Sequence, residues 1–182
     1  MEHIIETLKE GGTILYPSDT IWALGCDATN EKACQELIAL KNRPEDKSFI
    51  ILVDGFQMIE KHIPDFPDVC YDLVDFADKP LTVIYPDAKR LAPSILAADG
   101  SVGIRVTKDP ICLKLIRAMR RPLVSTSANI SGENNPTCFD DVNQILKEGV
   151  DAIVMERLTE KNNAVSQIIK IGVDYSVQII RQ

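Results

Sequence analysis

Short apolar blocks with strand spacing alternate with blocks of helical spacing from the start of the chain. Ile4 and Leu8 share one face of a short helix, which a Gly-Gly pair ends. Residues 13–16 and 21–26 are apolar runs of strand length, joined by a turn that begins at Pro17. The N-terminal pattern therefore predicts a helix followed by two strands.

A helix and a buried strand are expected next. Apolar side chains recur at helical spacing in residues 31–41, and Asn30 is a suitable N-cap. Residues 49–53 form a continuous apolar run, which is typical of a strand covered on both faces. Residues 54–80 have helical patches broken by prolines, and the pattern predicts no definite element there.

The second half of the chain continues the alternation. An Asp-Pro pair at 109–110 suits the start of a helix, and a further helix is expected around residues 142–149. Strands are expected at residues 81–85, 102–106, 123–126 and 152–155, and a closing hairpin at 165–171 and 175–181. Because no linker interrupts this order, we expect a single mixed α/β (α+β) domain over residues 1–182.

Composition narrows the class of protein. Apolar residues make up 45% of the 182 positions and charged residues 26%, which is typical of a globular chain with a hydrophobic core. The net charge of −7 argues against non-specific coating of nucleic acid, but it permits a local basic cleft. No apolar run approaches the ~20 residues that span a bilayer, and the acidic N-terminus does not resemble a signal peptide. Neither export nor membrane insertion is expected.

Cysteine and histidine usage argues against several kinds of site. The five cysteines are far apart and form no C-x-x-C pair, which suits reduced thiols and a cytoplasmic location. The two histidines, His3 and His62, lie in segments expected to be helix surface or loop, and neither has a second ligand at metal spacing. We therefore expect no bound zinc and no hydrolase that depends on a histidine.

Three polar clusters lie where a hydrophobic core does not need them. Residues 16–20 form a hydroxyl-rich corner that can bind a small polar ligand, although a simple turn is favoured for this cluster taken alone. Residues 41–47 bring lysine and arginine to a helix end, where they can bind phosphate or merely interact with the helix dipole. Residues 125–132 place several donors on a small-residue turn, which suits a phosphate or carboxylate as well as a capped loop. Neither the P-loop nor the Rossmann pattern is present.

A basic stripe carries a different hypothesis. Lys114, Arg117 and Arg121 follow one another at i, i+3 and i+7 on one expected helix. Such a stripe can contact RNA phosphates, although a solvated helix surface is the more economical interpretation. An RNA-binding module is therefore the rival to a small-molecule site.

Taken together, the polar clusters resemble the motifs of the YrdC-like family, whose best-known members are threonylcarbamoyl-AMP synthases. The similar segments are residues 16–25 (P-T-[ED]-T-x-Y-G-L-G in the family), 41–44 (K-x-R-P), 80–82 (the end of P-G-P-L-T), 102–106 (V-G-x-R-x-P), and 127–132 with 136–137 (S-A-N-x-S-G…P-T). The resemblance covers nearly the whole chain. It implies a twisted, open mixed sheet flanked by helices, with a central ligand cleft.

The resemblance also implies a reaction. The family joins L-threonine, bicarbonate and ATP, with Mg²⁺, into threonylcarbamoyl-AMP and pyrophosphate for tRNA threonylcarbamoyladenosine formation. Such a site must pair a carboxylate, hold a triphosphate and exclude water, and it needs no protein nucleophile. Implied partners are downstream tRNA-modification proteins, tRNA or double-stranded RNA, and a second copy in a homodimer.

The family's functional residues carry over onto matching positions of this chain. By resemblance, the catalytic set is Lys41, Arg43, Ser127 and Asn129. Threonine is expected at Thr20, Arg105, Ser125 and Ser166. The nucleotide is expected at Arg43, Lys47, Ser127, Asn135 and Arg181.

The chain departs from the family pattern at the walls of this expected site. Leu52 or Val53 stands where the family commonly has a histidine, Gln167 replaces a threonine, and Ala23 replaces a glycine. Two alternatives therefore stay open beside the synthase. One is an RNA-binding YrdC-like protein, and the other is a related nucleotide-dependent enzyme with a changed amino-acid or acyl substrate.

Overall fold

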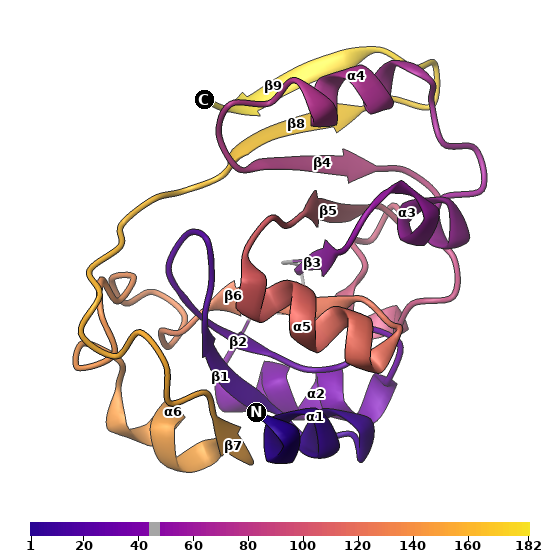
Figure 1. The fold of residues 1–182 in the computed structure, drawn as a ribbon. Coiled ribbons are helices and arrows are strands. Elements are labelled where there is room, and N and C mark those ends of the chain that lie inside the picture. The colour runs from indigo at the N-terminus through magenta and orange to yellow at the C-terminus, as the bar shows by residue number, and fades with distance from the viewer. Residues whose placement is uncertain (44–47) are drawn as a thin grey trace.

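A single mixed sheet of nine strands runs through the computed structural model, which describes residues 1–43 and 48–182 (Figure 1). The strand order is β7-β1-β2-β6-β3-β5-β4-β8-β9. The strands are β1 (Ile14–Pro17), β2 (Trp22–Gly25), β3 (Ile50–Val53), β4 (Leu81–Tyr85), β5 (Val102–Val106), β6 (Leu123–Ser127), β7 (Ala152–Ile153), β8 (Gln167–Ile171) and β9 (Val177–Arg181). Among the described strands, three neighbouring pairs are parallel (β1–β7, β3–β5, β4–β8) and the other five are antiparallel, so the fold is the mixed α/β architecture that the sequence predicts.

Six α-helices and one 3₁₀ turn accompany the sheet in the described residues. They are α1 (Glu2–Lys9), α2 (Glu31–Leu40), α3 (Phe56–His62), α4 (Val69–Asp75), η1 (Pro93–Ile95), α5 (Pro110–Met119) and α6 (Gln144–Gly149). The Asn30 side chain accepts the N–H of Ala33 and caps α2. Asp109 caps α5 in the same way, directly before a proline at the first helical position. Both predicted helix starts are therefore confirmed.

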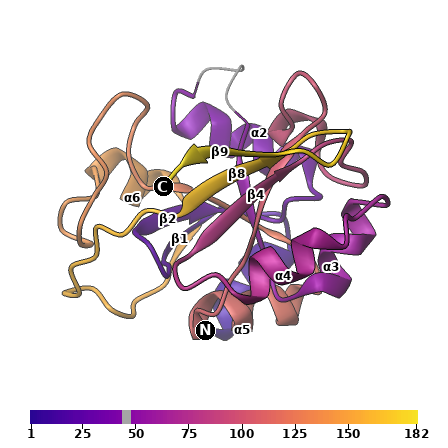
Figure 2. The ribbon, with the colours of Figure 1, turned by 90° about the horizontal axis from the view of Figure 1, so that it is seen from above.

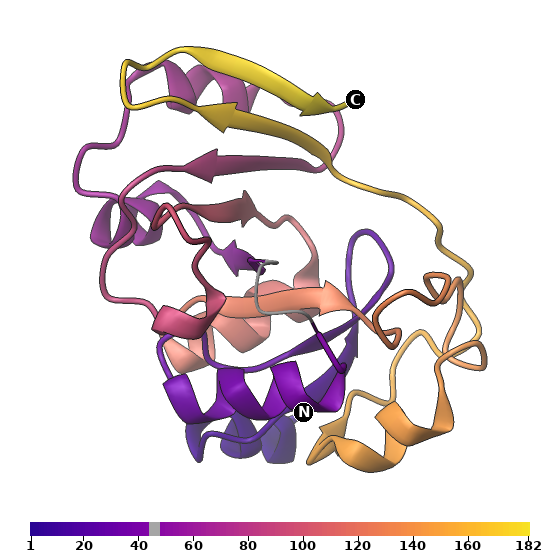
Figure 3. The ribbon, with the colours of Figure 1, turned by 180° about the vertical axis from the view of Figure 1, so that it is seen from behind.

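The helices divide between the two faces of the sheet. From the front, α1 and α5 lie over the lower strands, and from behind α2 covers the opposite face (Figures 1 and 3). Seen from above, β4, β8 and β9 cross over β1 and β2, so the sheet is strongly twisted (Figure 2). The strands β3, β5 and β6 lie at the centre and are covered on the α5 side, which leaves their other face to build a cavity.

Two expectations about local structure need correction. Residues 54–80, which the apolar pattern left without a definite element, contain α3 and α4, two short helices separated by a proline-containing turn. His62, expected on a surface, is buried at the end of α3, and its Nδ1 lies 3.0 Å from the Lys89 carbonyl oxygen. Burial lowers the pKa of His62, so the imidazole is held neutral as a core residue.

No helix within the described residues is both long and apolar enough to cross a membrane.

Candidate active site

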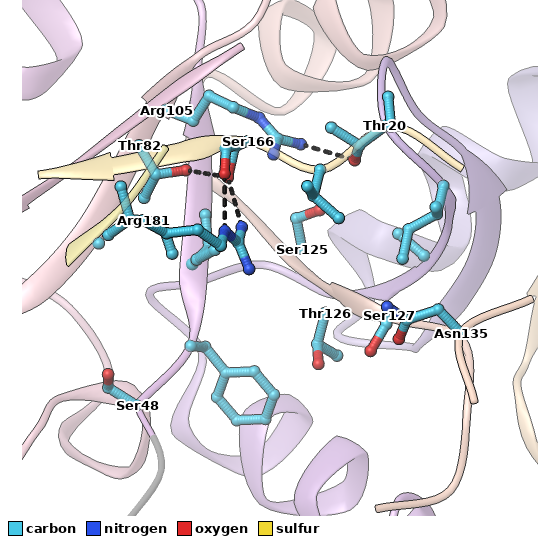
Figure 4. Close-up of a pocket in the computed structure, with 18 of the residues that line it drawn as sticks. Thr20, Ser48, Thr82, Arg105, Ser125, Thr126, Ser127, Asn135, Ser166 and Arg181 are labelled. Carbon is cyan, nitrogen blue, oxygen red and sulfur yellow. Dashed lines mark hydrogen bonds between the residues drawn. The ribbon is translucent and has the colours of Figure 1, made fainter. Parts of the chain in front are cut away.

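A cavity of about 330 Å³ opens on the face of the central strands opposite α5 (Figure 4). Most of the site residues expected from the sequence line it: Thr20, Arg43, Arg105, Ser125, Ser127, Asn135, Ser166 and Arg181. Lys41 and Asn129 lie behind its wall, and Lys47 lies outside the described residues. Segments that are far apart in sequence therefore meet at one polar cavity.

Strand register explains how the cavity floor is assembled. Ile50 of β3 pairs with Gly103 of β5 and with Ser125 of β6, so the three side-chain positions share one face. A Cβ at position 103 would lie 3.2 Å from Thr82 Cγ2 and 3.4 Å from Ile50 Cγ1. Glycine at this position therefore keeps the floor open between the neighbouring strands.

Arg105 is the buried cation at one end of the cavity. Its Nη2 lies 2.9 Å from Asp19 Oδ1 and 3.5 Å from Thr20 Oγ1. Its Nε is buried and has no hydrogen-bond partner among residues 1–43 and 48–182. A buried guanidinium N–H without an acceptor is costly, and an anionic ligand in the cavity would satisfy it. The geometry therefore suits recognition of a carboxylate.

A hydrogen-bonded group of Thr82, Ser166 and Arg181 connects the outer strands β8 and β9 to the cavity. The Thr82 hydroxyl lies 2.9 Å from Ser166 Oγ, which is buried. Arg181, near the end of β9, donates from Nε to the Ser166 carbonyl oxygen at 2.9 Å and from Nη2 to Ser166 Oγ at 3.2 Å (Figure 4). The last strand thus delivers a cation to the cavity rim and holds it in place.

Arg43 lies at the other side of the cavity. Its Nη2 donates to the Ser48 carbonyl oxygen at 2.7 Å, and its guanidinium carbon lies 4.5 Å from the centre of the Phe49 ring. Stacking on an aromatic face fixes the plane of a guanidinium group. Arg43 is therefore held ready for a phosphate.

Lys41 holds the small-residue turn after β6 from behind. Its ammonium group donates to the carbonyl oxygens of Ser127 and Asn129, the latter at 2.6 Å. The side chain is 1% exposed, and burial together with the neighbouring Arg43 lowers its pKa to about 7. Lys41 thus fixes the turn through neutral acceptors, and it stays uncompensated by any carboxylate within the described residues.

The turn itself is cross-linked by its own side chains. Ser127 Oγ and Asn129 Oδ1 are hydrogen-bonded, and Asn129 Nδ2 donates to the Glu133 carbonyl oxygen at 2.7 Å. The backbone N–H of Ser131 returns to the Lys41 carbonyl oxygen at 3.0 Å. The lysine motif and the S-x-N motif therefore form one rigid unit, which explains why both occur together.

Sequence reasoning missed two polar groups near the cavity. Asp19 and Thr82 were both inside quoted motifs, yet no role was assigned to either. The signal for Asp19 was its place next to Thr20 on the corner between β1 and β2, where its partner Arg105 is remote in sequence. A single sequence contains no indication of that pairing.

The basic stripe expected on one helix is divided in the structure, because Arg121 lies beyond the end of α5. The three cations are partly neutralised by acidic neighbours. Arg121 lies 2.6 Å from Asp27, which is buried, and Arg117 lies 3.9 Å from Asp54. Lys114 is exposed. Two of the three cations thus have acidic partners, so helix-surface ion pairing explains them without RNA.

Fold and cavity together define an α/β protein with arginines at two ends of one polar cavity, an arrangement that suits a small anionic ligand. The sequence profile described as "Telomere recombination" (Sua5/YciO/YrdC) matches residues 6–182. The chain belongs to this family.

Known relatives align over most of the chain. A protein of Pseudomonas aeruginosa named threonylcarbamoyl-AMP synthase is 35% identical over 157 residues, which cover 86% of this chain and 84% of that protein. Among solved structures, a variant of P. abyssi Sua5 is similar with a TM-score of 0.88 at 26% identity. The match covers 98% of this chain and 55% of that one.

A second solved structure with a similar fold is that of P. abyssi Sua5 complexed with L-threonine. Its TM-score is 0.81 at 26% identity, with 92% of this chain and 49% of that chain covered. This chain therefore spans about half the length of both Sua5 chains.

Proposed function

We propose that the chain is a threonylcarbamoyl-AMP synthase, which forms L-threonylcarbamoyladenylate and pyrophosphate from L-threonine, bicarbonate and ATP. One observation carries the proposal: a single cavity contains Arg105, with an unpartnered buried N–H, and Arg43 beside the Ser127 turn. The first suits a carboxylate and the second suits phosphates. Relatives named for this activity align over most of the chain, 86% of it in the P. aeruginosa protein.

At the amino-acid end, Arg105 would pair with the carboxylate of threonine. The hydroxyl of Thr20 lies against the same guanidinium, and the Ser125 and Ser166 hydroxyls lie along the adjoining wall. These short side chains leave room for a small amino acid and offer hydrogen bonds to its polar groups. Threonine thus fits the residues that remain despite the departures from the family pattern.

At the nucleotide end, Arg43, Arg181 and Asn135 line the cavity together with Ser127. Two arginines and the donors of the turn match a triphosphate, which we expect to enter with its Mg²⁺ ion as the substrate complex. Lys41 would act here by fixing the turn and by adding uncompensated positive charge behind it. An approaching phosphate would favour the protonated form of Lys41.

The proposed reaction needs positioning and charge more than a protein nucleophile. The deprotonated amine of threonine attacks the carbon of bicarbonate, and water leaves as the carbamate forms. A carbamate oxygen then attacks the α-phosphorus of ATP, and pyrophosphate departs with the electron pair of the broken P–O bond. Charge that builds on the α-phosphate would be stabilised by Arg43 and the Ser127 turn.

Pyrophosphate release tests this proposal directly. The full chain should release pyrophosphate from ATP and Mg²⁺ only when L-threonine and bicarbonate are both present. Lys41→Ala should lower the release by about 10²–10³-fold, while Lys32→Ala, on the exposed face of the helix that Lys41 follows, should leave it unchanged. Absence of release by well-folded wild-type protein, or release without threonine, would contradict the proposed function.

The wider setting belongs to the same proposal. We place the reaction in the cytoplasm, because all five cysteines carry free thiols, even though Cys26 and Cys34 have Sγ atoms only 3.7 Å apart. The product is reactive, so we expect a tRNA-modification protein to consume it promptly. We also propose that the enzyme can form a homodimer. Salt-dependent binding of tRNA or double-stranded RNA would support the RNA-binding alternative, and its absence at low salt would exclude direct contact.

A thermal-shift panel separates the remaining alternative. A ligand that binds only the folded state raises Tm by linkage. If L-threonine raises Tm more than other small amino acids do in the presence of an ATP analogue, the synthase is supported. A larger shift with a different amino acid or acyl acid would indicate the related enzyme with a changed substrate.

A further inference from the structure

A carboxylate of the protein already lies against the arginine that the proposed function gives to threonine. Asp19 Oδ1 and Arg105 Nη2 are 2.9 Å apart, with 19% and 4% of the two side chains exposed. Asp19 accepts a hydrogen bond from one terminal N–H group of the Arg105 guanidinium. The Nε–H group of Arg105 has no hydrogen-bond partner in the described part of the chain. The protein therefore satisfies only part of Arg105 and leaves the rest for a ligand.

Asp19 approaches Arg105 from outside the ligand cavity. It lines a separate cavity of about 290 Å³, which also contacts Lys79, Lys108 and the buried Asp109. Arg105 and Thr20, by contrast, line the ligand cavity, where the close-up shows the Arg105 guanidinium aimed at the Thr20 hydroxyl (Figure 4). The Asp19 carboxylate thus lies behind Arg105 as seen by a ligand, and it does not occupy the ligand's place.

The corner that carries Asp19 is itself held firmly. Ser18 Oγ donates to the Ile21 carbonyl oxygen at 2.7 Å and accepts the Thr20 N–H at 3.2 Å. Asn162 Nδ2 lies 3.4 Å from the Asp19 carbonyl oxygen, which ties the corner to the segment before β8. A carboxylate on so constrained a loop can fix the direction of the guanidinium it binds.

We propose that Asp19 is a positioning residue that orients Arg105 toward the amino-acid carboxylate and, through its negative charge, limits how tightly that carboxylate binds. The proposal rests on the proposed function, since it takes the ligand at Arg105 to be an amino acid. It assigns two opposite effects to one side chain. Orientation by Asp19 strengthens binding, and its charge weakens binding.

The two effects can be separated because asparagine keeps an oxygen where Asp19 Oδ1 lies. Asp19→Asn retains the hydrogen bond to Arg105 Nη2 and removes the negative charge. Two like charges separated by one guanidinium repel each other, so this variant should lower the Kd for L-threonine by about tenfold. Asp19→Ala removes both charge and acceptor, frees the guanidinium to turn, and should raise Kd by about tenfold.

Calorimetric titration of the full chain with L-threonine, with a non-hydrolysable ATP analogue present, measures these values. Asp54→Asn is a matched control, because it removes the charge of a second Asp–Arg pair, that with Arg117, outside the cavity. The control should leave Kd unchanged. Steady-state kinetics should show the Asp19 variants changing KM for threonine more than kcat, and thermal unfolding should confirm that each variant is folded.

The outcomes distinguish this proposal from the proposed function. Tighter binding in Asp19→Asn with weaker binding in Asp19→Ala supports the positioning role. Equally weaker threonine binding in both variants would show that the ligand needs the Asp19 charge itself. Equally tighter binding, or no change, would show that orientation of Arg105 by Asp19 does not matter. Each of these results overturns the proposal. If the wild type binds another small carboxylic acid but not threonine, the synthase assignment fails and the same comparison is made with that acid. If no carboxylic acid binds, both fail.

Discussion

The two ends of the cavity hold their buried cations in opposite ways. Arg105 has a carboxylate partner, Asp19, whose pKa burial raises and Arg105 lowers. In the part of the chain that the structure describes, Lys41 has neutral carbonyl and amide oxygens around its ammonium group, and burial lowers its pKa to about 7. Among the described residues, Arg105 therefore has a carboxylate partner before a ligand arrives, whereas Lys41 has none. That difference matches a singly charged carboxylate at one end and a polyanionic triphosphate at the other.

The largest effect is expected from breaking the nucleotide end. Lys41→Met removes the donor that joins the Ser127 and Asn129 carbonyl oxygens, so the turn loses its shape as well as the charge behind it. Loss of one preorganised electrostatic group typically lowers kcat by about 10²–10³-fold. The rate of pyrophosphate release at saturating substrate concentrations measures this fall in kcat. An unchanged kcat would show that the turn does not depend on Lys41.

Breaking the amino-acid end should cost both binding and stability. Arg105→Met leaves the partly buried Asp19 without its partner, which should lower the free energy of unfolding, by less than the ~3–5 kcal/mol of a fully buried pair, and abolish measurable threonine binding. The double variant with Asp19→Asn should recover much of the stability but none of the binding. Chemical denaturation and calorimetry on the same samples check both. Equal stability of the single and double variants would contradict the pairing.

The environment of Lys41 predicts that the stability of the protein depends on pH above about 7. The pKa of Lys41 is about 7 in the folded protein and near 10.5 when unfolded, so the unfolded state binds more protons between these values. Stability should therefore rise with pH from about 7 to 10.5, by at most about 1.4 kcal/mol per pH unit. Denaturation of wild type and Lys41→Met across this range isolates the contribution. A parallel pH dependence in both proteins would show that Lys41 is not the source.

The smallest effect on ligand binding is expected from a change at Ser166, which lies in the cavity wall between the amino-acid end and the nucleotide end. Ser166→Ala removes the hydroxyl that contacts both Thr82 and Arg181, but the Ser166 carbonyl oxygen still accepts from Arg181 Nε. Loss of one neutral network member costs about 0.5–1.5 kcal/mol. Kd for the ATP analogue should rise about three- to tenfold, with a similar change for threonine. A change confined to one ligand would assign Ser166 to that end alone.

Much of the framework could be predicted from apolar spacing and cap chemistry. Residues 50–53 form a buried strand because every side chain is apolar, and Asn30 and Asp109 start helices because their side chains accept free N–H groups. The helices α3 and α4 were not predicted because each is only seven residues long, which is too short for a clear helical periodicity, and because prolines interrupt the segment that contains them. Local patterns thus indicate long elements better than short ones.

The site was predictable in its members but not in its connections. Motif resemblance identified Arg105 and Lys41, yet their environments depend on partners that are remote in the chain. Asp19 meets Arg105 across 86 positions, and Lys41 reaches the turn at Ser127 across the same separation. Such pairings decide which cation has an acidic partner and which does not. The paired residues come together only when the sheet folds.

A crystal structure of the full chain with L-threonine and a non-hydrolysable ATP analogue tests the central claim most directly. The account predicts both ligands in the one cavity, with the threonine carboxylate within hydrogen-bond distance of Arg105 and the phosphates at Arg43 and the Ser127 turn. Binding of threonine away from Arg105, or of the phosphates away from that turn, would contradict it.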